Sequence, residues 1–504
     1  MINKLRQYRH AVIISTLFTT LASMAGIFRF DHYVSATFDL GCFTEMVKTT
    51  LQGIKGSSGM LLYDRTEGFS HFAIHFSPAM FIVVPFYAIW HSPITLLIVQ
   101  AIMVGIGGFL IYYLAFNVFK LSKKVSIIVL LAYVLNPLVW SLLVFDFHEL
   151  AFAVPFVMLM IIGYFKKNNW IFLIGLGLSL CVKEDVIATV GLLGVSLIVI
   201  EWLKTKKFRL NGYAVTMIIA AVVGICVAVL VSWKASDNQV PQILNSIIQR
   251  YTDSEMIKKP TLLSTGIWYI RYVFDSYSIG QFIAYFAPLC FLPFFSIEWG
   301  IPACFVLLIA MVSTWGGQHN YINQYGMTAV PYLFTATIVT LSKKGKEWDI
   351  QKNIKWMAIG GCIAMAILYL LTNLTGINEL IAPNFNKMTK EADSSLNQII
   401  KDIPKGESIT ITGNNLVLPH LVSDWDAYEA PTQFGTVKSI YGYPQTNTDY
   451  VITDTNTLIS QNYRATLTGP IVYNWDIEMA KELGESNNYQ LVNTVGDVDL
   501  WKLK

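Results

Sequence analysis

The sequence predicts an α-helical polytopic membrane protein of about eleven transmembrane helices, followed by a small extracytoplasmic α/β domain. Three observations predict this class: a depleted charge content, apolar runs of span length, and a tail of soluble composition. The 504 residues are 54% hydrophobic and only 14% charged, whereas a soluble domain carries about 25% charged residues. This excludes an ordinary cytosolic enzyme and a disordered scaffold. The net charge of +3 is too small to indicate a nucleic-acid partner.

The apolar runs set the number of spans. A helix needs about 20 apolar residues to cross a bilayer core about 30 Å thick. Such runs lie near 11–28, 93–119, 125–144, 150–165, 170–182, 187–202, 211–232, 279–296, 299–314, 327–341 and 354–372. A shorter run, 78–90, is bounded by prolines and is predicted to lie as a helix on the membrane surface.

Five clusters of basic residues test this count. With eleven spans and a cytoplasmic N-terminus, every cluster falls on one side of the membrane, as the positive-inside rule requires. The protein is therefore expected in the plasma membrane, with its C-terminal domain outside. The N-terminal run is expected to remain as a span, because no small-residue cleavage site follows Phe28. The clusters are Lys4, Arg6 and Arg9; Lys120, Lys123 and Lys124; Lys166 and Lys167; Lys204, Lys206, Lys207 and Arg209; and Lys343, Lys344 and Lys346.

Two domains are predicted. Residues 1–372 form the membrane domain, with a first outer loop at 30–77 and a fourth at 233–278. Residues 373–504 form the soluble domain. Its alternating patterns predict helices at 386–402 and 476–485 and strands at 408–412, 450–453, 490–494 and 498–503. The six cysteines are scattered and show neither metal-ligand spacing nor a disulfide framework.

The outer loops hold the residues that could carry chemistry. Asp39 follows the first span and is either a helix N-cap or a general base for an acceptor hydroxyl. Asp146, His148 and Glu149 interrupt two apolar runs, and Asp146 and Glu149 share one helical face. A capped helix with its acids in water is the alternative. Three ionisable groups in four positions are more than a cap needs, which favours a functional role.

Cation and metal sites are also candidates. His71 and His75 are spaced to share a helical face, as a metal pair would be, although amphipathic interfacial histidines fit equally. A divalent ion held by His75, His148 and Glu149, with Asp39 or Asp146, is one hypothesis. Lys183 in Lys183-Glu184-Asp185 is either part of a self-neutralising cluster or a phosphate contact. Arg271 and His319 face the same compartment and are grouped with Lys183 as candidate phosphate-binding residues.

Four motifs, in this order and spacing, carry a resemblance. The chain resembles domain-of-unknown-function family 2079 of prokaryotic membrane proteins over roughly 25–345, and two phrases of the tail also fit, Ile403-Pro404-Lys405-Gly406 and Leu418-Pro419-His420-Leu421. Members often carry proline where this chain has Glu149, which argues against Glu149 as a ligand. The motifs are Phe38-Asp39-Leu40-Gly41, His75-Phe76-Ser77-Pro78, Asp146-Phe147-His148-Glu149 and Val182-Lys183-Glu184-Asp185.

That family looks like a branch of the GT-C glycosyltransferases, which include protein O-mannosyltransferases and aminoarabinose transferases. The resemblance implies a GT-C-like fold and transfer of a sugar, with inversion, from a polyprenyl-phosphate donor to an extracytoplasmic glycan, lipid or protein acceptor of the cell envelope. Asp39 and Asp146 match the two acids of those enzymes, and Lys183 matches a basic residue near the donor phosphate. Two alternatives stay open: a transporter or flippase of a lipid-linked solute, which broken mid-membrane helices would favour, and a non-catalytic receptor or assembly factor.

Overall fold

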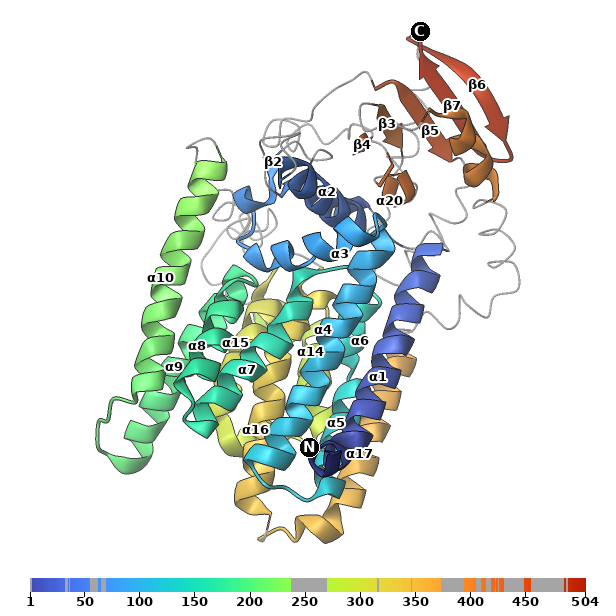
Figure 1. Cartoon of the computed structure of the whole chain (residues 1–504). Helices are drawn as coiled ribbons and strands as arrows, with labels where there is room; N and C mark the ends of the chain where they lie inside the picture. Colours follow the sequence, from blue (N-terminus) through green and yellow to red (C-terminus); the bar gives the residue numbers. More distant parts are fainter. Residues whose placement is uncertain are drawn as a thin grey trace.

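A computed structural model describes most of the chain (Figure 1). It covers residues 2–31, 37–54, 69–236, 270–314, 317–345 and 347–372 of the membrane domain, and residue 35 and 62–64 in the first loop. In the tail it covers 394–404, 409–413, 418–421, 423–424, 426–429, 448–454, 485 and 488–504. All but the last residue of the predicted helix at 476–485 and the first part of 386–402 lie outside these residues, as does most of the predicted loop 233–278.

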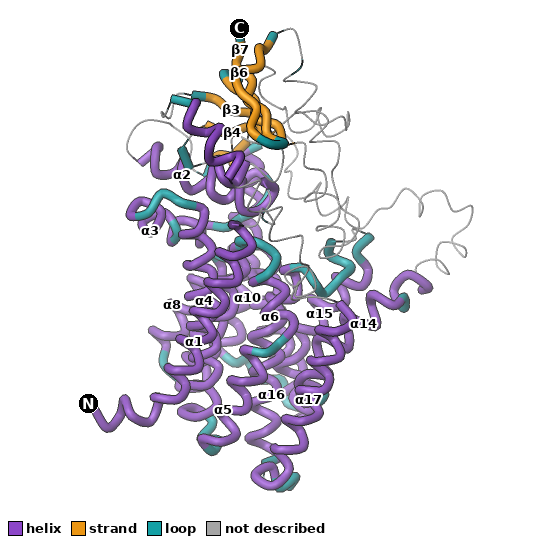
Figure 2. Tube along the Cα trace, turned by 90° about the vertical axis from the view of Figure 1, so that its right-hand side faces the viewer, coloured by secondary structure: helices purple, strands orange, loops and turns teal. Residues whose placement is uncertain are grey.

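The described part is mostly helical, and a bundle of helices forms its core (Figures 1 and 2). Each apolar run of the sequence is helical over most of its length. The helices of the bundle are α1 (Ile2–Asp31), α4 (Pro93–Tyr113), α5 (Lys123–Val134), α6 (Pro137–Leu143), α7 (Ala153–Lys166), α8 (Asn169–Leu180), α9 (Glu184–Thr205), α10 (Gly212–Ala235), α14 (Ser276–Phe286), α15 (Ile297–Val312), α16 (Val330–Lys344) and α17 (Ile350–Thr372).

Seven or eight of the eleven predicted spans meet the criterion of length. Among the described residues, seven helices are long and apolar enough to cross a membrane, or eight if the bent pair α5 and α6 is one span. The predicted spans at 170–182, 279–296 and 327–341 are helices of only 12, 11 and 15 residues. Two of them are shortened by irregular turns, η6 (Ala287–Leu289) beside α14 and η8 (Gln324–Ala329) before α16. Apolar composition alone did not reveal these breaks.

The basic clusters gather at one end of the bundle, which we call the basic end. Tyr8 of α1 stacks on Tyr113 of α4, whose hydroxyl accepts a hydrogen bond from Lys166 at the end of α7. Across the bundle, Glu298 at the start of α15 pairs with Lys204 of α9 and Lys343 of α16. The N-terminus lies at this end and the C-terminal sheet at the other (Figure 1). We call the opposite end the tail end.

The first loop covers the tail end with short elements. They are η1 (Thr37–Gly41), α2 (Cys42–Ile54), β1 (Tyr63–Asp64), β2 (Phe69–Ser70), η2 (His71–Ala73), η3 (Pro78–Ile82) and α3 (Val84–Ile89). The predicted surface helix at 78–90 is present in two pieces, η3 and α3. Its side chains Phe86, Ile89 and Trp90 are exposed, as expected of a helix that lies in a membrane interface.

The tail forms a five-stranded mixed sheet of order β4-β3-β5-β7-β6. The strands are β3 (Thr410–Gly413), β4 (Asp426–Glu429), β5 (Tyr450–Asp454), β6 (Tyr489–Val495) and β7 (Val498–Leu503). Four of them match the predicted strands, and β4 was not predicted. β3 pairs in parallel with β4 and β5, whereas β7 pairs antiparallel with β5 and β6. The short helix α20 (Leu418–Leu421) lies between β3 and β4 in the chain.

Candidate functional site

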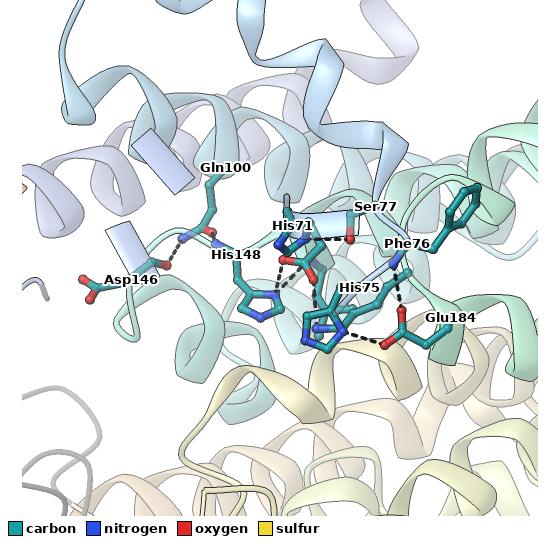
Figure 3. A network of polar contacts seen from close by, with 11 residues as sticks. His71, His75, Phe76, Ser77, Gln100, Asp146, His148 and Glu184 are labelled. Atoms are coloured by element: carbon teal, nitrogen blue, oxygen red, sulfur yellow. Dashed lines mark hydrogen bonds and ion pairs between the residues drawn. The ribbon is translucent and has the colours of Figure 1, made fainter. Parts of the chain in front are cut away.

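Three segments meet in a buried polar network at the tail end (Figure 3). The loop 71–77 comes from the first outer loop, the turn 146–149 joins α6 to η5 (Glu149–Phe152), and Lys183-Glu184 begins α9. We define the polar network as His71, His75, Ser77, Gln100, His148, Glu149, Lys183 and Glu184. The sequence singled out most of these residues, but not which of them would pair.

Glu149 is the centre of the network. Its Oε1 lies 2.9 Å from Lys183 Nζ, and its Oε2 lies 3.0 Å from His148 Nδ1. The side chains of Glu149 and Lys183 are 0% and 3% exposed. Burial lowers the pKa of Lys183, but the carboxylates of Glu149, Asp185 and Glu184 outweigh it and raise that pKa above its ordinary value. Lys183 therefore carries its charge, and Glu149 balances it.

Two histidines of the network, His71 and His148, are buried in surroundings that disfavour their charged form. Burial lowers the pKa of His71 and holds the pKa of His148 well below its ordinary value, although the nearby Glu149 opposes both shifts. His148 Nδ1 accepts a hydrogen bond from the backbone N–H of Leu150 at 3.4 Å and so caps the start of η5. Its ring also lies edge-on to Phe43 of α2, at 5.7 Å between centroids, so an aromatic side chain fixes its plane.

A second carboxylate ties the first loop to α9. Glu184 Oε1 lies 2.7 Å from His75 Nδ1, and Glu184 Oε2 accepts a hydrogen bond from the backbone N–H of Phe76 at 3.2 Å. Nearby, the N–H of Ala79 donates to the carbonyl of Cys181 at 2.8 Å. The predicted motif at 75–78 is thus docked on the predicted motif at 182–185.

Gln100 is the residue of the network that the motifs missed. It lies in α4, is 1% exposed, and holds both sides of the turn 146–148. Its Nε2 donates to the carbonyl of Asp146 and its Oε1 accepts from the N–H of His148, each at 2.7 Å. A lone glutamine inside an apolar run of span length is the signal that sequence reading could have used.

The carboxylate of Asp146 points away from His148 and His75 (Figure 3). It is only 3% exposed, so it does not face open solvent. Asp39 lies in η1, is partly buried, and η1 packs against α2, α4 and α20. Arg29, a buried side chain at the end of α1, donates to the carbonyl of Phe145 at 3.4 Å, directly before Asp146. Both acid-bearing turns therefore lie at the tail end and against α4.

Comparison with known families assigns the chain to one of them. The family described as "Predicted membrane protein (DUF2079)" matches residues 29–475. The chain belongs to this family. The protein is therefore a multi-pass membrane protein, and the match extends beyond the predicted 25–345 into the tail. No curated protein matches the chain.

All four motifs expected of a DUF2079 chain lie within the matched residues, and the fold brings three of them together in the polar network. The fourth, at 38–41, forms η1, which packs against α2, α4 and α20. The three predicted phosphate-binding residues have different surroundings: Lys183 is buried in its pair with Glu149, Arg271 is exposed, and His319 lies 3.1 Å from Asp275 and stacks on Tyr272.

The predicted metal site does not form among the described residues of this DUF2079 protein. They contain no group of three or more histidine, cysteine, aspartate or glutamate side chains arranged to hold a metal. Glu149 faces the ammonium of Lys183, and His75 faces Glu184 rather than His148 or Glu149. A lysine in contact with the central carboxylate replaces the charge that a cation would supply.

The tail touches the candidate site through α20. His420 stacks on Phe30 at the end of α1, with ring centroids 4.2 Å apart, and α20 packs against η1. The Tyr87 hydroxyl of α3 donates to Ser423 at 3.2 Å. Burial lowers the pKa of His420 to about 3. The tail phrase at 418–421 thus lies against the turn that carries Asp39.

Proposed function

We propose that this protein is a GT-C-type membrane glycosyltransferase that moves a sugar from a polyprenyl-phosphate donor to an acceptor on the tail-end side of the membrane, with inversion. One observation carries the proposal: the turns that bear Asp39 and Asp146 both lie against α4 at the tail end, where Asp146 is buried and Asp39 is partly buried. If the two acids lay at opposite ends of the bundle, or fully in solvent, the structure would contradict the proposal.

In this proposal Asp39 is the general base. It takes the proton of the acceptor hydroxyl as that oxygen attacks the anomeric carbon, while the bond to the donor phosphate breaks. A lipid phosphate is already a good leaving group, so positioning and charge stabilisation supply most of the rate. No covalent intermediate is needed, which is why the anomeric configuration inverts.

Charge near the departing phosphate comes from the end of α1. Lys183 was the expected contact, but its pairing with Glu149 gives it a structural partner instead. Arg29 is buried beside the turn of Asp146, and arginine suits bidentate contact with phosphate. We therefore assign Arg29 to the phosphate and Asp146 to the acceptor or sugar hydroxyls beside it.

A transporter or flippase is the second candidate, and one observation favours it. The predicted span 125–144 is broken: α5 and α6 differ in direction by 44° across Leu135 and Asn136. Broken helices near the bilayer middle are common at transport sites. The sequence reading expected no such break, so the experiment must separate transfer of sugar from movement of lipid.

The experiment uses the full-length protein in vesicles with a panel of polyprenyl-phosphate sugars. Wild type should consume one donor and release polyprenyl phosphate, whereas Asp39→Asn should lose at least 100-fold in turnover. The matched control is Asp497→Asn, in the exposed β6–β7 turn. Equal rates for D39N and wild type would remove Asp39 from the mechanism. Donor translocation without cleavage in wild type would establish the transporter instead.

A further inference from the structure

A groove runs along the outer surface of the bundle between α5 and α17, at the opposite end from the polar network. Its open part has a volume of about 510 Å³. Apolar side chains line it, chiefly Ile128 of α5 and Ala358, Ile359, Cys362 and Ile363 of α17. A deeper cavity of about 150 Å³ continues from it toward Leu135 and Pro288. Ile128, Ala358 and Cys362 line both spaces, so they form one groove.

The groove has the length of one acyl chain in one leaflet. It extends along α17 from Lys355 to Ala366, which is about 16 Å at the helical rise of 1.5 Å per residue. Half of a bilayer core about 30 Å thick is about 15 Å. At its inner end the Tyr369 hydroxyl donates to the carbonyl of Leu135 at 3.1 Å, which closes the groove near the middle of the membrane.

Two ammonium groups stand at the mouth. Lys124 is the second residue of α5 and Lys355 lies in the first turns of α17, and both line the groove. Within the described part of the chain, neither lies within 4.0 Å of a carboxylate, whereas Lys204 and Lys343 at the same end are paired with Glu298. A slot with apolar walls and two uncompensated positive charges at the water interface selects an amphiphile with a negative head.

We propose that this groove binds one anionic phospholipid of the leaflet at the basic end, its phosphate between Lys124 and Lys355 and one acyl chain along α17. Basic pockets between transmembrane helices bind anionic headgroups in this way. Lysine side chains extend their stems along apolar surface and keep their charge at the interface. A zwitterionic lipid would gain the apolar contacts but little from the two charges. The site lies at the other end of the bundle from Asp39 and is independent of the proposed sugar transfer.

The test compares lipid retention by charge-matched variants. Full-length protein is purified from vesicles that contain equal amounts of phosphatidylglycerol and phosphatidylcholine, and bound lipid is counted by native mass spectrometry. Wild type should retain one phosphatidylglycerol. The double variant K124Q/K355Q should bind it about 10- to 30-fold more weakly, since each lysine near a membrane surface contributes about a factor of five. The control K123Q/K352Q removes the same charge from exposed positions on the same helices and should change binding less than threefold.

A third variant isolates the apolar wall. Ala358→Trp fills the groove while both lysines remain, and it should lose retention as K124Q/K355Q does. Soluble glycerol phosphate at millimolar concentration should not displace the lipid, because it lacks the acyl chain. Equal losses in the two double variants would show general charge attraction and overturn the proposal. Equal retention of the two lipids by wild type, or full retention by A358W, would overturn it as well.

Discussion

Glu149 and Lys183 show how a buried ion pair can be structural at a site that invites a catalytic interpretation. Removing one partner leaves the other charged and out of water, which costs about 3–5 kcal/mol. Lys183→Met should therefore destabilise the protein by about that amount, and adding Glu149→Gln should restore most of it. Thermal unfolding in detergent measures both. The control is Lys204→Met, whose side chain is 59% exposed in its pair with Glu298 and should cost less than about 1 kcal/mol. If Lys183→Met unfolded at the same temperature as wild type, the pairing of Lys183 with Glu149 would be contradicted.

Gln100 is predicted to position Asp146 rather than to react. Gln100→Leu leaves the carbonyl of Asp146 and the N–H of His148 without their partner, and each unsatisfied buried group costs about 1–3 kcal/mol. We expect lower thermal stability and, in the transfer assay, a fall in kcat larger than any change in KM. Gln100→Glu keeps the acceptor for the N–H of His148 but not the donor for the carbonyl of Asp146. Its stability and its kcat should therefore lie between those of wild type and those of Gln100→Leu. A variant with wild-type kcat would exclude the positioning role.

At the scale of single residues, the sequence indicated the ionisable residues of the site but not the residues that they contact. The spacing of Asp146, His148 and Glu149 indicated a functional turn, and the structure buries all three. It could not predict that Glu149 would pair with Lys183, because that contact joins segments 34 positions apart. Arg29 and Gln100 were missed because each stands as a single polar residue in or beside an apolar run. Their significance depends on which backbone carbonyl they reach, which is a property of packing.

At the scale of the elements, the helices α7 and α8 approach each other so closely that glycine is required where they touch. A Cβ added at Gly175 of α8 would lie 2.2 Å from the backbone nitrogen of Met160 in α7, and one at Gly163 would lie 2.3 Å from that of Phe172. Backbone atoms cannot yield as a flexible side chain would. Small residues at helix interfaces allow such contact in membranes. The closely spaced runs at 150–165 and 170–182 therefore form a tight antiparallel hairpin.

This predicts opposite results for two neighbouring glycines. Gly175→Ala should separate α7 from α8 and destabilise the protein by about 2 kcal/mol or more, in the range of overpacked cores. Gly177→Ala is the matched control, since a Cβ there meets nothing within 4 Å, and it should be neutral or slightly stabilising. Thermal unfolding of the two variants decides. Similar melting temperatures would mean that the α7–α8 contact is looser than described.

The helices themselves were predictable because apolar runs of this length have few alternatives in lipid. The interruptions of these helices were harder to predict from the sequence. Asn136-Pro137 splits the run at 125–144, because Pro137 occupies the first position of α6 and Asn136 accepts a hydrogen bond from the N–H of Leu138 at 2.9 Å. Hydropathy alone does not detect such a break, and it therefore predicts one span over 125–144. The turn signal was present in the sequence but was outweighed by composition.

At the scale of the whole molecule, the contact between tail and bundle should depend on pH. His420 has a pKa of about 3 against Phe30, compared with about 6.5 when exposed. Because its pKa is lowered, its contribution is complete above pH 6.5 and is lost as the pH falls from 6.5 toward 3. At pH 5 the loss is roughly 1–2 kcal/mol, discounted for partial exposure.

Hydrogen exchange of residues 418–421, followed from pH 7.5 to pH 5 and corrected for intrinsic rates, measures this release. His420→Phe keeps a ring against Phe30 but cannot take up a proton, so its protection should change less with pH than that of wild type. The nearby acids Asp39 and Asp424 are the same in both proteins. The difference between the two pH dependences of protection is therefore due to His420. The same slope in both would mean that another group controls the contact.

The distribution of charge predicts the orientation of the whole chain. The described residues of the basic clusters, scattered between positions 4 and 344, gather at one end of the bundle, and the tail sheet and both candidate acids lie at the other. From the positive-inside rule we predict that the basic end lies in the cytoplasm. Alkaline phosphatase, which is active only outside the cytoplasm, should be active when fused after Lys504 and inactive when fused after Thr205 at the basic end. The reverse pattern would put Asp39 and Asp146 in the cytoplasm. It would then exclude an extracytoplasmic acceptor, and the anionic lipid of the α5–α17 groove would belong to the outer leaflet.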